Sequence, residues 1–139
     1  MHPQASGAAP APLKVAASVA ALEAVAVLGV AVAELLSTSG DRLLLGLTTT
    51  LFFLLYGGLL LASSWLVTRG VSWTRGPVLM AQLFQLVLAW TLREEGTRAI
   101  AVALVVASAV VLAGMLHPQS VGFLLDDPEA ADGPEDRAV

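Results

Sequence analysis

The chain has 139 residues, of which 57% are hydrophobic and 13% are charged, and its mean hydropathy is +0.81. Soluble domains carry roughly 25% charged residues, so this composition excludes an ordinary soluble globular protein and indicates an integral membrane protein. Cysteine is absent from the sequence, which excludes disulfides, thiolate metal sites and a cysteine nucleophile.

The net charge of -4 is concentrated near the C-terminus. Residues 126–139 hold six acids and one base, a net charge of -5, whereas the preceding residues hold six bases and five acids, a net charge of +1. No basic stripe interleaved with aromatic residues is present to neutralise phosphates, so we expect no nucleic-acid partner.

Four apolar segments follow one another along the chain, and a span of about 20 residues crosses a hydrocarbon core of about 30 Å. We predict transmembrane helices at residues 15–36, 43–67, 77–92 and 99–116. The third is the shortest, but Pro77 suits a helix start and Trp90 suits a membrane interface. The first apolar run exceeds the about 7 to 15 residues of a signal-peptide core, so we expect it to be retained.

Short turns join the segments, which predicts antiparallel neighbours. The expected fold is all-α: a polytopic membrane protein whose four transmembrane helices form an up-down bundle over residues 13–120. Residues 1–12 are rich in Ala and Pro, and residues 121–139 are acidic. Both ends lack the apolar residues needed to offset ordering entropy, so we predict that both are disordered.

The orientation in the membrane rests on a small difference between two equal sets of basic residues. The predicted side of the termini holds Lys14, Arg69 and Arg75, and the other side holds Arg42, Arg93 and Arg98. Glu94 and Glu95 lie between two bases of the second set, whereas the turn at 68–76 has no acid. We therefore predict a multi-pass protein of the plasma membrane with both termini in the cytoplasm, and dual insertion is the minority alternative.

Glu23 is the acid that lies deepest in a predicted helix, eight residues from the start of the first segment, or about 12 Å in. An ionised residue at the bilayer centre costs about 2.5 to 3.5 kcal/mol, so Glu23 should face other helices and be protonated or hydrogen-bonded. Glu34, near the outer end, lies within about 20° of the same helical face. Ala16, Ala20 and Ala26 lie on or beside this face, where a neighbouring helix can pack closely.

Other segments place polar side chains at comparable depths. The candidates are Tyr56, Gln82, Gln85 and Ser108. Depth alone matches Glu23 with Tyr56, Gln85 and Ser108, which predicts a polar layer with Gln85 as a partner of Glu23. For the glutamines and Ser108 we favour purely structural hydrogen bonds between helices, whereas for Glu23 structural and functional interpretations stay open.

The sequence lacks the residues for a recognisable catalytic centre. Its two histidines, His2 and His117, do not suffice for a Ser-His-Asp arrangement or a histidine metal cluster. We expect no enzyme activity, no metal and no cofactor. The leading hypothesis is a non-enzymatic accessory, assembly or envelope-associated bundle whose partners are the lipid bilayer and either a second copy or another membrane protein.

Two short motifs carry a resemblance. Residues 72–77 (SWTRGP) leading into Gln82 and Gln85, with Leu116-His117-Pro118 after the last segment, resemble small four-helix integral membrane proteins of actinobacteria that have no assigned function. The resemblance covers roughly residues 13–120. It implies a four-helix bundle and transfers no activity.

The chain is also similar to small multidrug resistance transporters, which are four-helix proteins of this size with one membrane-embedded glutamate in the first helix. Glu23 lies at the matching place. This resemblance implies a proton-coupled transporter of lipophilic cations that uses Glu23. The other segments do not reproduce that family's aromatic-rich chamber, and the acidic tail is foreign to it, so the transporter is the alternative hypothesis.

Overall fold

The computed structural model describes residues 8–125, and every regular element within that range is helical. The elements are α1 (Ala11–Ser37), η1 (Gly40–Arg42), α2 (Leu43–Val67), η2 (Ser72–Thr74), α3 (Arg75–Thr91), α4 (Arg98–Leu116) and α5 (Pro118–Leu125). Three stretches of these residues are long and apolar enough to cross a membrane: α1, η1 with α2, and α4. The fold is therefore all-helical and compatible with a multi-pass membrane protein.

The helix bounds follow the sequence closely in the middle of the chain. The predicted helix at 43–67 is confirmed, and α4 begins one residue before the predicted 99. α3 covers 17 residues and begins at Arg75, two residues before the prediction. α1 begins at Ala11, so the predicted disorder over 1–12 is wrong at its last two residues. Pro12 is accommodated there because a proline in the first turn sacrifices no hydrogen bond.

The helix α5 was not predicted. Disorder was expected from residue 121, yet Val121 to Leu125 continue a helix that Pro118 begins. The side chain of Leu124 is buried, and the Ser120 hydroxyl donates a hydrogen bond to the Gly114 carbonyl oxygen at 2.6 Å. These contacts with the end of α4 supply the ordering that the short segment lacks by itself. Residues 126–139 of the predicted tail lie outside the described residues.

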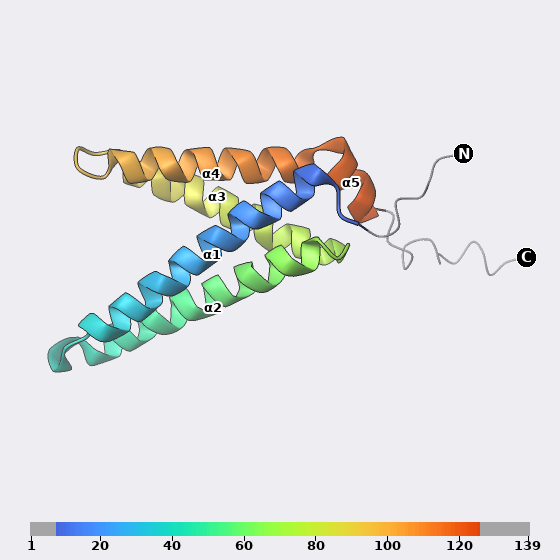
Figure 1. Cartoon of the computed structure of the whole chain (residues 1–139). Helices are drawn as coiled ribbons and strands as arrows, with labels where there is room; N and C mark the ends of the chain where they lie inside the picture. The colour runs from blue at the N-terminus through green and yellow to red at the C-terminus, as the bar shows by residue number, and fades with distance from the viewer. Residues whose placement is uncertain (1–7, 126–139) are drawn as a thin grey trace, which may run out of the picture.

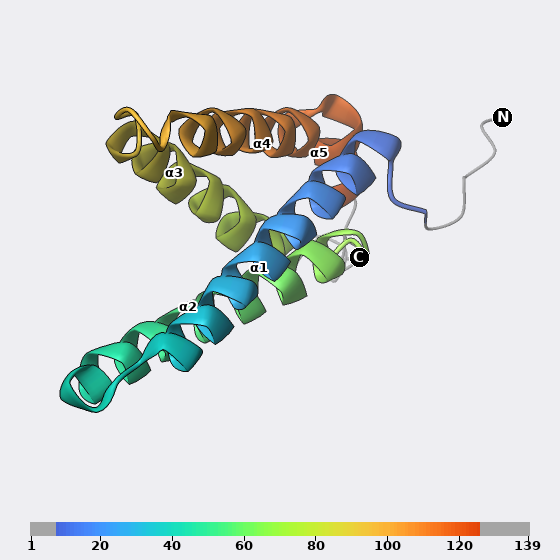
Figure 2. The ribbon, with the colours of Figure 1, turned by 60° about the vertical axis from the view of Figure 1, so that its left-hand side comes forward.

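The four long helices form two antiparallel hairpins, α1 with α2 and α3 with α4 (Figure 1). The hairpins converge at the end that carries α5 and diverge toward the α1–α2 and α3–α4 turns, as the second view confirms (Figure 2). The arrangement is a V, and the antiparallel up-down bundle of four transmembrane helices that we expected is not confirmed. We call its two ends the converged end and the open end.

The V follows from the distribution of small residues along α1. Its buried alanines are concentrated in the first half of the helix: Ala16, Ala17, Ala20 and Ala24. Beyond Ala24 only Ala31 of α1 is buried, and Ala26, expected on the packing face, is exposed. Close approach of several helices is therefore confined to the converged end.

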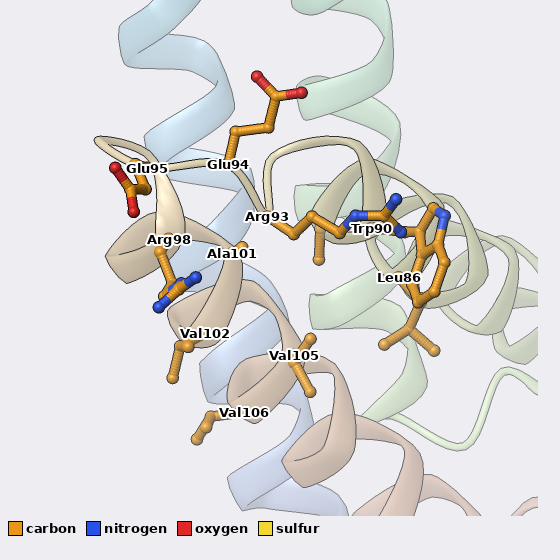
Figure 3. A pocket seen from close by; sticks show the side chains of 11 residues that line it. Leu86, Trp90, Arg93, Glu94, Glu95, Arg98, Ala101, Val102, Val105 and Val106 are labelled. Atoms are coloured by element: carbon orange, nitrogen blue, oxygen red, sulfur yellow. The ribbon is translucent and has the colours of Figure 1, made fainter.

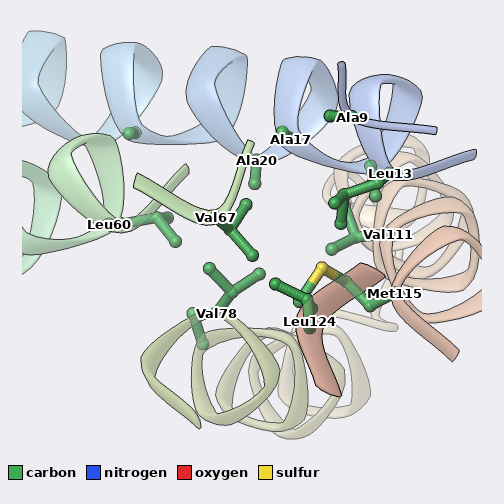
Figure 4. Close-up of a cluster of buried hydrophobic side chains, with 13 residues drawn as sticks. Ala9, Leu13, Ala17, Ala20, Leu60, Val67, Val78, Val111, Met115 and Leu124 are labelled. Carbon is green, nitrogen blue, oxygen red and sulfur yellow. The ribbon is translucent and has the colours of Figure 1, made fainter. Parts of the chain in front are cut away.

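The apolar core lies at the converged end (Figure 4). Its larger side chains come from all five α-helices and include Leu13, Leu60, Val67, Val78, Val111, Met115 and Leu124. Gly114 permits the contact between α4 and α1, since a Cβ atom there would lie 2.7 Å from the Ala16 Cβ. Gly57 does the same between α2 and α1, where a Cβ atom would lie 2.9 Å from the Leu28 Cγ.

Candidate functional site

Glu23, the acid of the predicted first span, faces α3. The Gln82 side chain donates from Nε2 to the Glu23 Oε2 at 2.9 Å, and Gln82 is fully buried. The prediction that Glu23 faces other helices is confirmed, but the expected partner Gln85 is wrong. Depth alone matched Glu23 with Gln85. The angle between the hairpins and the rotation of α3 instead bring the residue one turn earlier to the carboxyl group.

Two acceptor atoms of this pair have no partner among the described residues. They are Glu23 Oε1 and Gln82 Oε1, both buried. A buried acceptor without a donor costs roughly 1 to 3 kcal/mol. A carboxylate can only accept, whereas a carboxylic acid also donates. A proton on Glu23, or a ligand that brings a donor, would therefore satisfy the site, which makes the pair suited to binding protons or cations.

An aromatic cluster lies beside the polar pair. The Tyr56 ring stacks on Phe52 with centroids 6.1 Å apart, and Phe84 of α3 lies at 5.9 Å on a tilted plane. The Tyr56 hydroxyl is buried and has no hydrogen-bond partner within residues 8–125, and Glu23 is close enough to act on it electrostatically. Tyr56 and Glu23 therefore lie near each other, but no hydrogen bond joins them among the described residues. The spacing of Phe52 and Tyr56 by one helical turn was the available signal for this cluster, but Phe84 is added only by the packing of α3.

The same aromatic residues line a groove of about 750 Å³ between α2 and α3. Its walls are almost entirely apolar and include Phe52, Tyr56, Leu60, Pro77, Met80 and Phe84. Tyr56 therefore connects two environments, an apolar groove on one side and the field of Glu23 on the other.

The remaining predicted layer residues form a separate pair. Ser108 of α4 donates to the Gln85 Oε1 at 3.4 Å, and both side chains are buried. This contact joins α3 to α4 within the second hairpin. Its geometry is that of an interhelical hydrogen bond, the structural interpretation that the sequence favoured for both residues.

Glu34 lies apart from this cluster, close to the α1–α2 turn. It lines a cavity of about 390 Å³ together with Arg42 and Thr49, and its carbonyl oxygen accepts a hydrogen bond from the Thr38 hydroxyl. Sharing a helical face with Glu23 does not bring Glu34 to α3, because the V has already separated the hairpins there. Within residues 8–125, no three His, Asp or Glu side chains lie together as a metal site would require.

Comparisons with protein-family models, with curated proteins and with solved structures found no match to this chain. Neither resemblance drawn from the sequence receives support from them. The features of the molecule that bear on its function are the V-shaped arrangement and the buried polar cluster.

Proposed function

We propose that the protein is a four-span integral membrane protein with a non-enzymatic accessory or assembly role. The observation that carries this proposal is the exposure of residues 31–51, the part of the first hairpin beyond the converged end and the aromatic cluster. Only Ala31 and Thr50 are buried in this arm. Its exposed leucines would be covered in a membrane by lipid and, in an assembly, by a second copy or another membrane protein.

A fourth span is part of this proposal. α3 is short, but exposed tryptophans flank it: Trp73 just before it and Trp90 near its end. They lie 17 residues apart in the sequence, which corresponds to about 25 Å of helix. Tryptophans favour the two membrane–water interfaces, so this spacing supports a membrane-crossing α3. Because about 25 Å is shorter than an average hydrocarbon core of about 30 Å, the bilayer would be slightly thinned around this helix.

A topology experiment tests the span count and the orientation together. We propose a location in the plasma membrane with both termini in the cytoplasm. Reporters fused after Gly40 and after Glu95 should then read as external, whereas fusions within residues 70–74 and after Val139 should read as cytoplasmic. An α3 that does not cross would place residues 70–74 and Glu95 on one side, and a reversed pattern would overturn the orientation.

The assembly role is tested by cross-linking, which the natural absence of cysteine makes clean. Leu51→Cys places a thiol on the exposed arm, and Val15→Cys is a matched control at the converged end; the two native side chains are 57% and 53% exposed. Oxidation in native membranes should cross-link the Leu51→Cys chain to itself, or a thiol-reactive cross-linker should join it to a reproducible partner. Absence of both products, together with a monomer in mild detergent that turns over a substrate, would refute the proposal.

A second function is favoured by the polar cluster. Beside an aromatic groove of about 750 Å³, Glu23 and Tyr56 each hold a buried atom that no described residue pairs with. A carboxyl group that exchanges a proton for a cation, next to aromatic faces that attract cations, is the chemistry of a proton-coupled transporter of lipophilic cations. We keep this transporter as the alternative to the assembly role.

Reconstituted vesicles with an imposed proton gradient separate the two functions. A transporter that exchanges protons for cations should move lipophilic cations in the direction opposite to the proton flow. Glu23→Gln should abolish this flux without unfolding the protein. Glu34→Gln is the matched control, since it removes an acid from the same helix outside the cluster. No Glu23-dependent flux across a panel of lipophilic cations would reject the alternative for those substrates.

A further inference from the structure

A groove in the first hairpin carries basic residues at its mouth. It lies between α1 and α2 at the converged end, encloses about 620 Å³, and is lined by Lys14, Ala17, Ser18, Ala21, Leu61, Ser64, Trp65 and Thr68. Lys14 is the fourth residue of α1 and Thr68 directly follows α2. The mouth is therefore at the level of the helix ends, and the alanines lead about 10 Å inward from Lys14.

A second cation is fixed at the same mouth. The Arg69 guanidinium lies 4.2 Å from the centroid of the Trp65 ring, and Trp65 is 57% exposed. An exposed indole favours the membrane–water interface, so its stacking on Arg69 holds the cation at the depth of lipid headgroups.

Nothing acidic balances these cations within the described part of the converged end. The sequence has no acid over residues 8–22, 42–93 or 96–125. Nearby, the Nε atom of Arg75 is buried and has no hydrogen-bond partner among the described residues. The converged end is thus a basic surface placed at an interface.

We propose that this groove binds an anionic phospholipid, whose phosphate is held by Lys14 and Arg69 and whose acyl chain lies along Ala17, Ala21 and Leu61. The chemistry that selects the ligand is a phosphate oxyanion joined to a hydrocarbon chain. The cations attract the phosphate oxyanion, and the small side chains of the apolar wall leave room for the hydrocarbon chain. A free phosphate would leave the apolar inner part of the groove uncovered.

The acidic residues of 126–139 are the competing occupant, because they follow α5 in the sequence. An acidic segment carries charge but little hydrocarbon, whereas the groove wall along Ala17, Ala21 and Leu61 is apolar. The apolar wall beside the two cations therefore favours lipid. The proposal does not depend on either function argued above.

The test measures binding of phosphatidylglycerol and of phosphatidylcholine to the delipidated full-length protein by native mass spectrometry. Wild type should prefer phosphatidylglycerol. Lys14→Gln and Arg69→Gln should each weaken its binding about fivefold, which corresponds to about 1 kcal/mol per cation. Both side chains are exposed, so neither substitution should perturb folding, which circular dichroism in the same detergent checks.

Arg93→Gln is the matched control at the open end. Arg93 lies 4.2 Å from the centroid of the Trp90 ring, the same geometry as the Arg69 pair, but Glu94 and Glu95 line the cavity around it (Figure 3). This variant should bind phosphatidylglycerol as wild type does. An equal loss in Arg93→Gln, or no loss in the Lys14 and Arg69 variants, would overturn the proposal.

Two further binding measurements distinguish the possible sources of negative charge in the groove. Soluble glycerol phosphate should not displace the lipid at concentrations where short-chain phosphatidylglycerol does, and equal displacement would reject the lipid site. A full-length variant with the six acids of 126–139 replaced by amides should bind the lipid as wild type does. If Lys14-dependent binding appears only in that variant, the acidic segment occupies the groove in the natural chain and the proposal is wrong.

Discussion

The converged and open ends of the V are built from similar apolar residues but pack them differently. At the converged end five helices meet, and side chains such as Leu13 and Met115 are fully buried. At the open end each hairpin packs only on itself, and leucines of comparable size remain more than half exposed. Hydropathy was therefore a poor guide to burial in this chain. The converged end should determine stability, and the open end should be available for contacts with lipid or protein.

The largest expected effect is a cavity at the converged end. Met115→Ala removes a fully buried side chain from the core and should lower the free energy of unfolding by about 2 to 5 kcal/mol. Leu51→Ala deletes a side chain of similar size from the exposed arm and should cost less than about 0.5 kcal/mol. Thermal unfolding in detergent compares the two. Equal losses would mean that the open end is packed as tightly as the converged end.

A second comparison uses two helical glycines. Gly114→Ala puts a methyl group 2.7 Å from the Ala16 Cβ and 2.5 Å from the Pro12 carbonyl oxygen, so it should destabilise by about 1 to 3 kcal/mol. Gly58→Ala meets no atom within 4 Å and should stabilise α2 by about 0.5 to 1 kcal/mol. The same melting experiment measures both. The same Gly→Ala change should therefore lower the free energy of unfolding at position 114 and raise it at position 58. A stabilising Gly114→Ala would show that α1 and α4 can separate freely.

The polar cluster lies where the hairpins begin to part, and its variants measure how firmly they are joined there. Glu23→Ala removes the acceptor of the fully buried Gln82 amide and should cost about 1 to 3 kcal/mol. Glu23→Gln keeps an oxygen acceptor and removes the cost of ionisation, so stability should be preserved or slightly raised. Chemical denaturation of both variants tests this order. A Glu23→Gln protein that loses as much stability as Glu23→Ala would mean that the charge itself holds the hairpins together.

The smallest expected effect concerns the second hairpin alone. Ser108→Ala removes a long hydrogen bond to Gln85 and should lower stability by about 0.6 kcal/mol, the average for hydrogen bonds between membrane helices. Ser64→Ala is the control. The Ser64 hydroxyl bonds to the Leu60 carbonyl oxygen of its own helix, so removing it breaks no contact between helices. A loss above about 2 kcal/mol for Ser108→Ala would indicate that this pair, and not the apolar core, holds α3 to α4.

Much of the secondary structure was determined by the sequence alone. The bounds of α2 matched the prediction because an apolar run flanked by Arg42 and by the Thr68-Arg69-Gly70 turn leaves few alternatives for a helix in a membrane. Gly70 has φ +82°, a conformation that favours glycine, and the ring of Phe123 in α5 lies against it. The turn was readable in the sequence, but the helix that covers it was not.

Only the tertiary structure decided which polar residues meet. Depth along a helix follows from counting residues, and that count alone predicted that Glu23 and Tyr56 lie at comparable levels. Rotation about the helix axis and the angle between hairpins depend on every packed side chain, from the alanines of α1 to Gly114. For that reason Gln82 and not Gln85 binds Glu23, and the four long helices form a V whose open end leaves hydrophobic faces uncovered.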